Sequence, residues 1–241
     1  TFNLFNWEEE GVANNLRVTG RLGGEGTLKV ISLGDMSLDL RNVDVNMVSV
    51  YIGAPTAAPR TIYIPASADD LRNIEFWSNH ASHYLTVDLA GNSLTTERVT
   101  VDERTVVGNG TVHTTSWDST DGGVLGDATV VLRDGGTVKL APGQSFDRLE
   151  IASDDGRSAS WNMTATGTVS PVVTGLKSGS YLWYLDGVEQ GEVKAGKDGT
   201  IALSYTSTGL HTLEVKPTPM IIAMDGVYQA VGIVAVLAVL G

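Results

Sequence analysis

The chain has 241 residues, of which 42% are hydrophobic and 18% are charged, so it can bury a core and is not disordered as a whole. Its net charge of −12 and its lack of any basic run argue against a nucleic-acid partner, which would require a Lys/Arg face. The absence of cysteine excludes thiol catalysis, thiolate metal sites and disulfides.

The first residue is Thr1 and not Met, which removal of a signal peptide or an arbitrary choice of starting point would explain. From about Leu16 to Thr115, apolar and polar residues alternate with a period of two, the pattern of half-buried β-strands. The clearest alternating runs are Met36/Leu38/Leu40, Val43/Val45/Met47 and Leu85/Val87/Leu89. This pattern predicts a first half made of short strands.

The polar stretch from Ser116 to Gly123 separates this half from a second set of strands between about Val124 and Val215. Each half holds roughly seven to nine short strands, which is typical of a β-sandwich. We therefore predict an all-β chain with an immunoglobulin-like or jelly-roll-like β-sandwich over residues 1–116, a linker over 117–123 and a second sandwich over 124–217. A parallel β-solenoid is the alternative, and it is less favoured because no repeat of fixed period is visible.

In the second half, Asp-Gly pairs stand between apolar alternations and predict tight turns, because Asp-Gly readily adopts positive φ values. These pairs lie at Asp134-Gly135, Asp155-Gly156, Asp186-Gly187 and Asp198-Gly199. The strongest hairpin signal is Tyr181–Leu185, followed by Asp186-Gly187 and a strand from Val188 to Val193.

Three further segments complete a recognisable pattern: Thr174-Gly-Leu-Lys-Ser-Gly-Ser-Tyr181, Asp198-Gly-Thr-Ile201 and Gly209-Leu-His-Thr-Leu-Glu-Val215. Together with the hairpin, this pattern resembles the fibronectin-III-like and immunoglobulin-like modules of archaeal and other prokaryotic cell-surface proteins. The resemblance covers about a quarter of the chain and concerns architecture. It implies that a sandwich is closed by the last strand, and such modules serve as spacers, adhesins or coat components.

The C-terminal segment 218–241 is expected to form an apolar helix, because no charge occurs from Gly226 to Gly241. That uncharged part would give a helix of roughly 24 Å, short of a hydrocarbon core of about 30 Å. The segment is predicted to enter a bilayer or a bundle of identical helices, and packing into the core of its own domain is the alternative. The residues expected to make these contacts are Tyr228, Val231, Ile233, Val234, Val236, Leu237 and Leu240.

His80 and His83 are spaced so that both imidazoles could bind one metal ion on a helical turn, although no third ligand is fixed. In the same segment, Trp77 and Tyr84 could stack on the faces of sugars, with ordinary core packing of Trp77 as the plainer interpretation. A metal site and a sugar-binding patch are therefore two separate hypotheses for this segment.

Asn109-Gly-Thr and Asn162-Met-Thr are N-glycosylation acceptor sequences, and Asn109 is favoured because Gly110 predicts a loop. Acidic residues also gather in predicted loops at Asp118/Asp121/Asp127 and Asp154/Asp155. Loop carboxylates can bind Ca²⁺, but the ladder of an EF-hand is absent, and no other cofactor is expected.

None of the common catalytic motifs is present, neither Gly-x-Ser-x-Gly nor His-Glu-x-x-His nor a phosphate-binding loop. We therefore expect a non-enzymatic, extracytoplasmic structural subunit of a cell envelope, an extracellular filament or a membrane-containing virion. Its expected partners are copies of itself and a bilayer or helix bundle at its C-terminus. A carbohydrate-binding or adhesive module is the alternative, and a glycan-acting enzyme with two convergent carboxylates is a third hypothesis.

Overall fold

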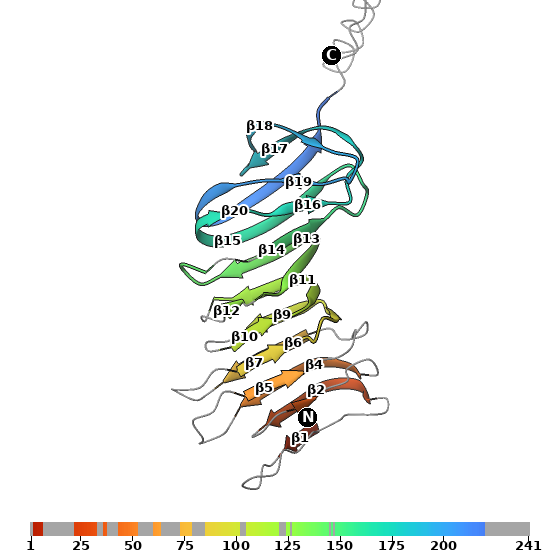
Figure 1. Cartoon of the computed structure of the whole chain (residues 1–241), viewed down its shortest axis with the longest axis vertical. Coiled ribbons are helices and arrows are strands. Elements are labelled where there is room, and N and C mark those ends of the chain that lie inside the picture. The colour runs from red at the N-terminus through yellow and green to blue at the C-terminus, as the bar shows by residue number, and fades with distance from the viewer. Residues whose placement is uncertain are drawn as a thin grey trace, which may run out of the picture.

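The computed structural model describes residues 2–6, 22–32, 36–37, 43–52, 60–63, 73–78, 85–101, 105–120, 124–125, 127–144, 146 and 148–219. These residues form β-strands joined by short turns, so the prediction of an all-β chain is confirmed for them. The strands stack along the long axis of the molecule, from β1 at one end to the β17–β18 hairpin at the other (Figure 1). The described part of the chain is a β-solenoid.

One side of the solenoid is a parallel sheet in which each turn of the chain adds one strand. Its order is β1-β2-β4-β6-β9-β11-β13-β15, and every neighbouring pair is parallel. The strands are β1 (Phe2–Asn6), β2 (Leu22–Ser32), β4 (Val43–Ile52), β6 (Asn73–Ser78), β9 (Arg98–Val101), β11 (Thr111–Ser119), β13 (Thr129–Leu140) and β15 (Ala159–Val169).

Two further stacks of short strands close the coils. The second stack has the order β12-β10-β7-β5-β3, again parallel throughout. It consists of β3 (Met36–Ser37), β5 (Arg60–Tyr63), β7 (Leu85–Asp88), β10 (Thr105–Gly108) and β12 (Val124–Leu125). The third stack is built by β8 (Ser93–Thr95), the first parts of β11 and β13, β14 (Arg148–Ala152), β16 (Val172–Thr174) and the antiparallel β19 (Ile201–Ala202).

The C-terminal end of the solenoid is covered by antiparallel strands, which we call the cap. In it, β20 (Tyr205–Pro217) pairs with β15 along that strand's full length, and β17 (Gly179–Leu185) pairs with both β20 and β18 (Val188–Ala195). The predicted hairpin is confirmed, because Asp186 and Gly187 adopt φ values of 51° and 76° between β17 and β18.

A ladder of apolar side chains runs through the interior of the solenoid. The buried residues Leu28, Ile74, Val99, Trp117, Val138 and Met163 belong to one register column, which also includes Val48. Successive members of this column, from Leu28 to Met163, are separated in the sequence by 20, 26, 25, 18, 21 and 25 residues. Successive strands lie about 4.8 Å apart, so each buried side chain packs on the one from the next coil.

Two β-sandwich domains were therefore the wrong prediction, and so was the immunoglobulin-like or fibronectin-III-like sandwich in the second half. An alternating pattern shows which residues are buried, but the same pattern fits parallel and antiparallel neighbours. The coils differ in length, so the solenoid has no fixed period in the sequence. Trp117 to Ser119, the start of the expected linker, lie in β11, which pairs with β13 on the far side of that linker.

The Asp-Gly pairs account for much of the wrong β-sandwich prediction, because only Asp186-Gly187 closes an antiparallel hairpin. Asp134-Gly135 lies within β13, between the part that pairs with β14 and the part that pairs with β15. Gly135 and Gly156 have φ values of 74° and 68° and stand where the chain turns a corner of the coil, whereas Gly199, with a φ of 70°, joins β18 of the cap to the antiparallel β19. The same turn chemistry thus serves parallel corners as well as antiparallel connections.

Candidate functional site

Several residues that the sequence singled out lie outside the described residues: His80, His83, Tyr84, Asp121 and the seven apolar positions from Tyr228 to Leu240. The predicted C-terminal helix falls there too. Trp77 belongs to β6, where its backbone pairs with Tyr51, but its side chain is not described. The metal site at His80/His83, the sugar patch at Trp77/Tyr84 and the anchoring segment stay predictions.

Asn109 sits at a corner of the solenoid and not on a free loop. Its φ is 54°, its Nδ2 donates to Asp88 Oδ1 at 2.8 Å, and its backbone N–H donates to Asp127 Oδ1. Asp88, Asn109 and Asp127 end or follow β7, β10 and β12, so a polar ladder joins three successive coils. Asn162 lies in β15, and its Oδ1 accepts a hydrogen bond from Thr212 Oγ1 at 2.8 Å. Glycosylation of either residue stays a prediction.

Asp155 accepts hydrogen bonds from its own turn, whereas Asp118 lies in β11 and not in a loop as predicted. The N–H groups of Arg157 and Ser158, at 2.7 and 2.8 Å from Asp155 Oδ1, lower the pKa of Asp155 to about 2. Burial alone would raise the pKa of Asp118, but hydrogen bonds from Thr120 and the Lys139 ammonium lower it. Within the described ranges, no three His, Asp or Glu side chains gather closely enough to hold a metal ion.

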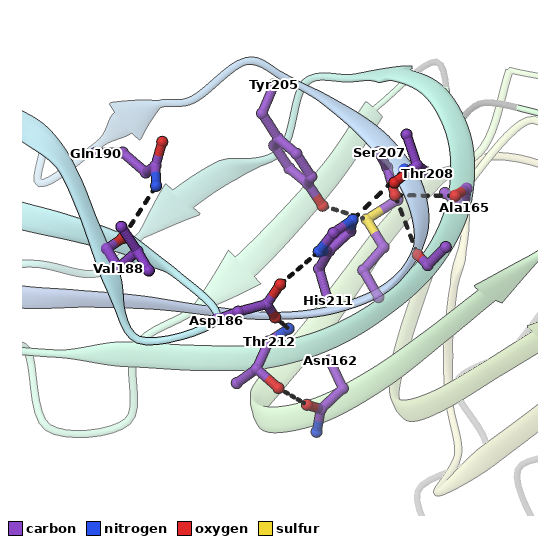
Figure 2. Close-up of polar contacts among 12 residues, drawn as sticks. Asn162, Ala165, Asp186, Val188, Gln190, Tyr205, Ser207, Thr208, His211 and Thr212 are labelled. Atoms are coloured by element: carbon purple, nitrogen blue, oxygen red, sulfur yellow. Dashed lines mark hydrogen bonds and ion pairs between the residues drawn. The ribbon is translucent and has the colours of Figure 1, made fainter.

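The cap carries a polar cluster around the β17–β18 turn (Figure 2). Asp186 Oδ2 lies 2.7 Å from His211 Nδ1, and Asp186 Oδ1 accepts the Thr212 N–H at 2.8 Å. The Asp186 N–H in turn donates to the Thr212 carbonyl at 2.8 Å. A single turn residue therefore ties the hairpin to β20 through both its backbone and its carboxylate.

His211 packs beneath the hairpin against aromatic and sulfur groups. Its ring meets the Tyr205 ring edge-on at 6.4 Å, and the Tyr205 hydroxyl donates to Met163 Sδ at 3.3 Å (Figure 2). Burial, and secondarily the Asp186 charge, raise the pKa of Tyr205, so this phenol stays protonated. The hydrogen bond from His211, followed by the one from the Thr212 N–H, lowers the pKa of Asp186.

An Asp–His pair also occurs in catalytic dyads, but here the second imidazole nitrogen of His211 already accepts a backbone hydrogen bond. The Thr208 N–H points at His211 Nε2 from 3.4 Å, which assigns the ring proton to Nδ1 and makes His211 its donor to Asp186. Within the described part of the chain, no hydroxyl is hydrogen-bonded to this ring as a nucleophile would be. The cluster is suited to holding the hairpin in place.

Trp183 and Tyr184 do not form a shared platform for a sugar. Adjacent residues of a strand face opposite sides of the sheet. Trp183 pairs with buried Val215, and its ring lies 6.4 Å from Tyr205 at a tilt of 47°. Tyr184 pairs with Glu214 on the outer side, where Lys216 Nζ stands 5.4 Å from its ring centroid. The coplanar arrangement that a carbohydrate module would use is not formed by these two rings.

A cavity of about 200 Å³ lies between β14 and the end of β15, with Phe146, Leu149, Met163, Thr168, Val169 and Ser170 as its lining. Pockets that hold cofactors or drug-sized ligands usually measure about 300–1,000 Å³ and carry converging polar groups. This cavity is too small for such a ligand.

Sequence reasoning missed the Asp186–His211 cluster. Asp186 was assigned only a turn, and His211 entered only as part of the fibronectin-III-like pattern. The two residues are 25 positions apart and meet because β17 pairs with β20. No local pattern in the sequence signals such a contact.

Fold and cap together define the class: a parallel β-solenoid closed by an antiparallel β-cap. No protein-family model matches the chain, and neither a curated protein nor a solved structure matches it. No helix that could cross a bilayer occurs among the described residues, which end at Pro219.

Proposed function

We propose that this chain is an extracytoplasmic structural subunit, anchored through residues 218–241 and carrying its solenoid as a rod away from the anchor. The proposal rests on the position of the apolar segment in the sequence, directly after the capped end of the solenoid. β20 is the last strand of the cap, and the sequence after it is apolar and uncharged from Gly226 to Gly241. The anchoring sequence thus follows the capped end of an elongated molecule, opposite β1 (Figure 1).

The junction between rod and anchor is held to the cap by backbone contacts. Pro217 pairs with Tyr181 of β17, and the Thr218 N–H donates to the Ser180 carbonyl at 3.0 Å. The rings of Pro217 and Pro219 fix their own φ angles, and each proline also restricts the residue before it. These contacts fix the direction in which the chain leaves the cap, as a scaffold or coat subunit requires.

Solenoid coils contact only their neighbours, which produces elongated molecules. The cavity described above, of about 200 Å³, is too small for a drug-sized ligand. This geometry favours a structural role over a small-molecule enzyme. Water rejects the apolar segment, so it is expected to enter lipid or to pack against identical segments of other subunits. Self-association of the anchors would place several rods side by side.

The test is a comparison of the full chain with a form that lacks Pro219–Gly241. The full chain should float with phosphatidylcholine vesicles, or sediment as a large assembly without detergent, and the shortened form should remain a monomer in water. A second variant keeps the full length and places charges in the apolar segment, V234D together with L237D, and should lose vesicle binding. Equal behaviour of all three forms in water would overturn the proposal.

A further inference from the structure

Four of the chain's six lysines lie where the cap leads into the C-terminal segment. We call this group the lysine collar: Lys177, Lys194, Lys197 and Lys216. Lys194 pairs with Ser180, the residue whose carbonyl accepts the Thr218 N–H, and Lys216 immediately precedes Pro217. Lys216 therefore stands directly at the exit of the chain, and Lys194 lies on β18, separated from the exit by β17.

The other two lysines are brought to the same end by contacts between corner loops. Ser178 Oγ donates to the Ala195 carbonyl at 3.3 Å, which links the start of β17 to the end of β18. The Leu176 N–H donates to the Gly199 carbonyl at 3.0 Å, so the loop of Lys177 lies against the loop of Lys197. The loops of Lys177 and Lys197 thus lie together at the end of the β17–β18 hairpin that also contains Ser180, the partner of Thr218.

Three collar lysines have no carboxylate partner among the described residues. Lys177, Lys194 and Lys197 are exposed and form no ion pair there, whereas Lys216 Nζ lies 2.8 Å from Glu214. The carboxylates nearby include Glu192 on β18 and Asp198, which accepts hydrogen bonds from Thr200. Asp154, Asp155 and Arg157 stand at the adjacent corner, which contacts Lys177 through the Gly156 carbonyl.

Charge is unevenly distributed along the rod. Residues 1–171 contain 12 Lys/Arg and 22 Asp/Glu, and residues 172–219 contain 4 Lys and 5 Asp/Glu. Of those five acids, Asp186 and Glu189 belong to the turn end of the hairpin, away from the collar. Counted over the described residues alone, the part up to residue 171 carries 7 Lys/Arg and 11 Asp/Glu, so it is acidic, whereas residues 172–219 are nearly neutral and include the three lysines without an ion pair.

We propose that the lysine collar docks the capped end of the rod onto the anionic surface of a lipid bilayer. This inference rests on the proposed anchoring function. Basic residues beside a membrane segment attract anionic headgroups within a Debye length of about 8–10 Å, each strengthening binding roughly fivefold. The same anionic surface repels the acidic part of the solenoid. Attraction of the collar and repulsion of the rest of the solenoid both favour an orientation in which the rod points away from the bilayer.

The test measures how the full chain partitions between buffer and two kinds of vesicle, neutral phosphatidylcholine and phosphatidylcholine mixed with phosphatidylglycerol. The collar variant carries K177Q, K194Q and K197Q. A matched control removes the same number of positive charges from the rod, with R98Q, R133Q and K139Q. All six side chains are exposed, and the surface ion pair of Lys139 with Asp118 should contribute less than about 1 kcal/mol, so circular dichroism and thermal unfolding should stay close to those of the unmodified chain in both variants.

The collar variant should lose its preference for anionic vesicles by on the order of a hundredfold, three factors of about five, while its binding to neutral vesicles is unchanged. The control should keep the preference, and raising the salt concentration should abolish it. An unchanged preference in the collar variant would overturn the inference, as would an equal loss in the control.

Two other outcomes separate this inference from the anchoring proposal. If the unmodified chain ignores neutral vesicles but binds anionic ones through the collar, the anchor fails and the collar stands. If heparin, a soluble polyanion, binds the collar as tightly as anionic vesicles do, the partner is not a bilayer and the inference is wrong.

Discussion

In turns of the solenoid and of its cap, aspartate carboxylates accept hydrogen bonds from backbone N–H groups. Asp155 does so for Arg157 and Ser158, Asp198 for Thr200, and Asp186 for Thr212. For Asp155 these backbone hydrogen bonds are the largest cause that lowers its pKa. For Asp198 the Thr200 hydroxyl, and for Asp186 the His211 ring, lower the pKa more than the backbone N–H does. The charged form is therefore the one that stabilises the fold.

Asp155 should give the solenoid a measurable pH dependence. Its pKa falls from an ordinary value of 3.8 to about 2 on folding, so its contribution is complete above pH 3.8 and is lost as the pH falls toward 2. D155N should unfold at lower urea concentration than the unmodified chain at pH 7, and this difference should shrink toward pH 2. Urea midpoints measured across that range provide the check.

Asp154 is the matched control, because it is the exposed neighbour of Asp155 in the same corner. D154N should show the pH dependence of the unmodified chain. A D155N difference that stays constant from pH 7 to pH 2 would contradict the assigned role of the carboxylate.

At the scale of elements, single strands were predictable and their partners were not. Ile201, Leu203 and Tyr205 are buried while Ala202 and Ser204 are exposed, as their alternation predicts. The Tyr181–Val193 hairpin was also predictable, because its turn and both strands are local. The parallel partner of Val99 is Trp117 on one side and Ile74 on the other, and no local property of Val99 selects either residue.

The candidate site was less accessible to sequence reasoning than the strands. The Asp186–His211 contact and the lysine collar depend on which strands become neighbours in the cap, and that pairing is a property of the whole coil stack. The apolar character of the C-terminal segment is visible in the sequence alone, and its helix stays a prediction.

Two glycines in turns of the cap region distinguish the energetic cost of a positive φ from the cost of crowding around an added Cβ. Gly187 and Gly199 have φ values of 76° and 70°, but a Cβ at Gly187 meets nothing within 4 Å, whereas one at Gly199 would overlap the Leu176 carbonyl oxygen. G187A should cost about 1–2 kcal/mol of unfolding free energy, the penalty of a left-handed alanine. G199A should cost clearly more, because the Leu176–Gly199 hydrogen bond must also move.

Denaturant unfolding of the two glycine variants measures both costs. Equal destabilisation by G187A and G199A would show that the loop of Leu176 does not pack as closely against the loop of Gly199 as described. The loop of Lys177 would then be free to move relative to Lys197.

At the scale of the whole molecule, stability should depend on contacts between neighbouring coils. Trp117 is fully buried in the middle of the interior ladder, between Val99 and Val138. W117A should lower the unfolding free energy by about 3–5 kcal/mol. Leu210 is 66% exposed, so L210A should change it by less than about 0.5 kcal/mol.

Amide hydrogen exchange should show where W117A acts. Because solenoid coils contact only their neighbours, protection should fall first in β9, β11 and β13, and the β17–β18 hairpin should keep most of its protection. A uniform loss of protection across the cap and the coils would indicate a single cooperative unit and would contradict this description.

The unequal coils have a consequence for the distance that such a molecule can span. Between successive contacts of the interior ladder the chain uses anything from 18 to 26 residues, yet each circuit adds the same thickness of about 4.8 Å. The length of the rod is therefore set by the number of circuits and not by the number of residues. Extra residues in a circuit widen the cross-section of that coil without lengthening the rod. Gaining or losing one circuit would move the β1 end by a fixed step and leave the cap at the other end untouched.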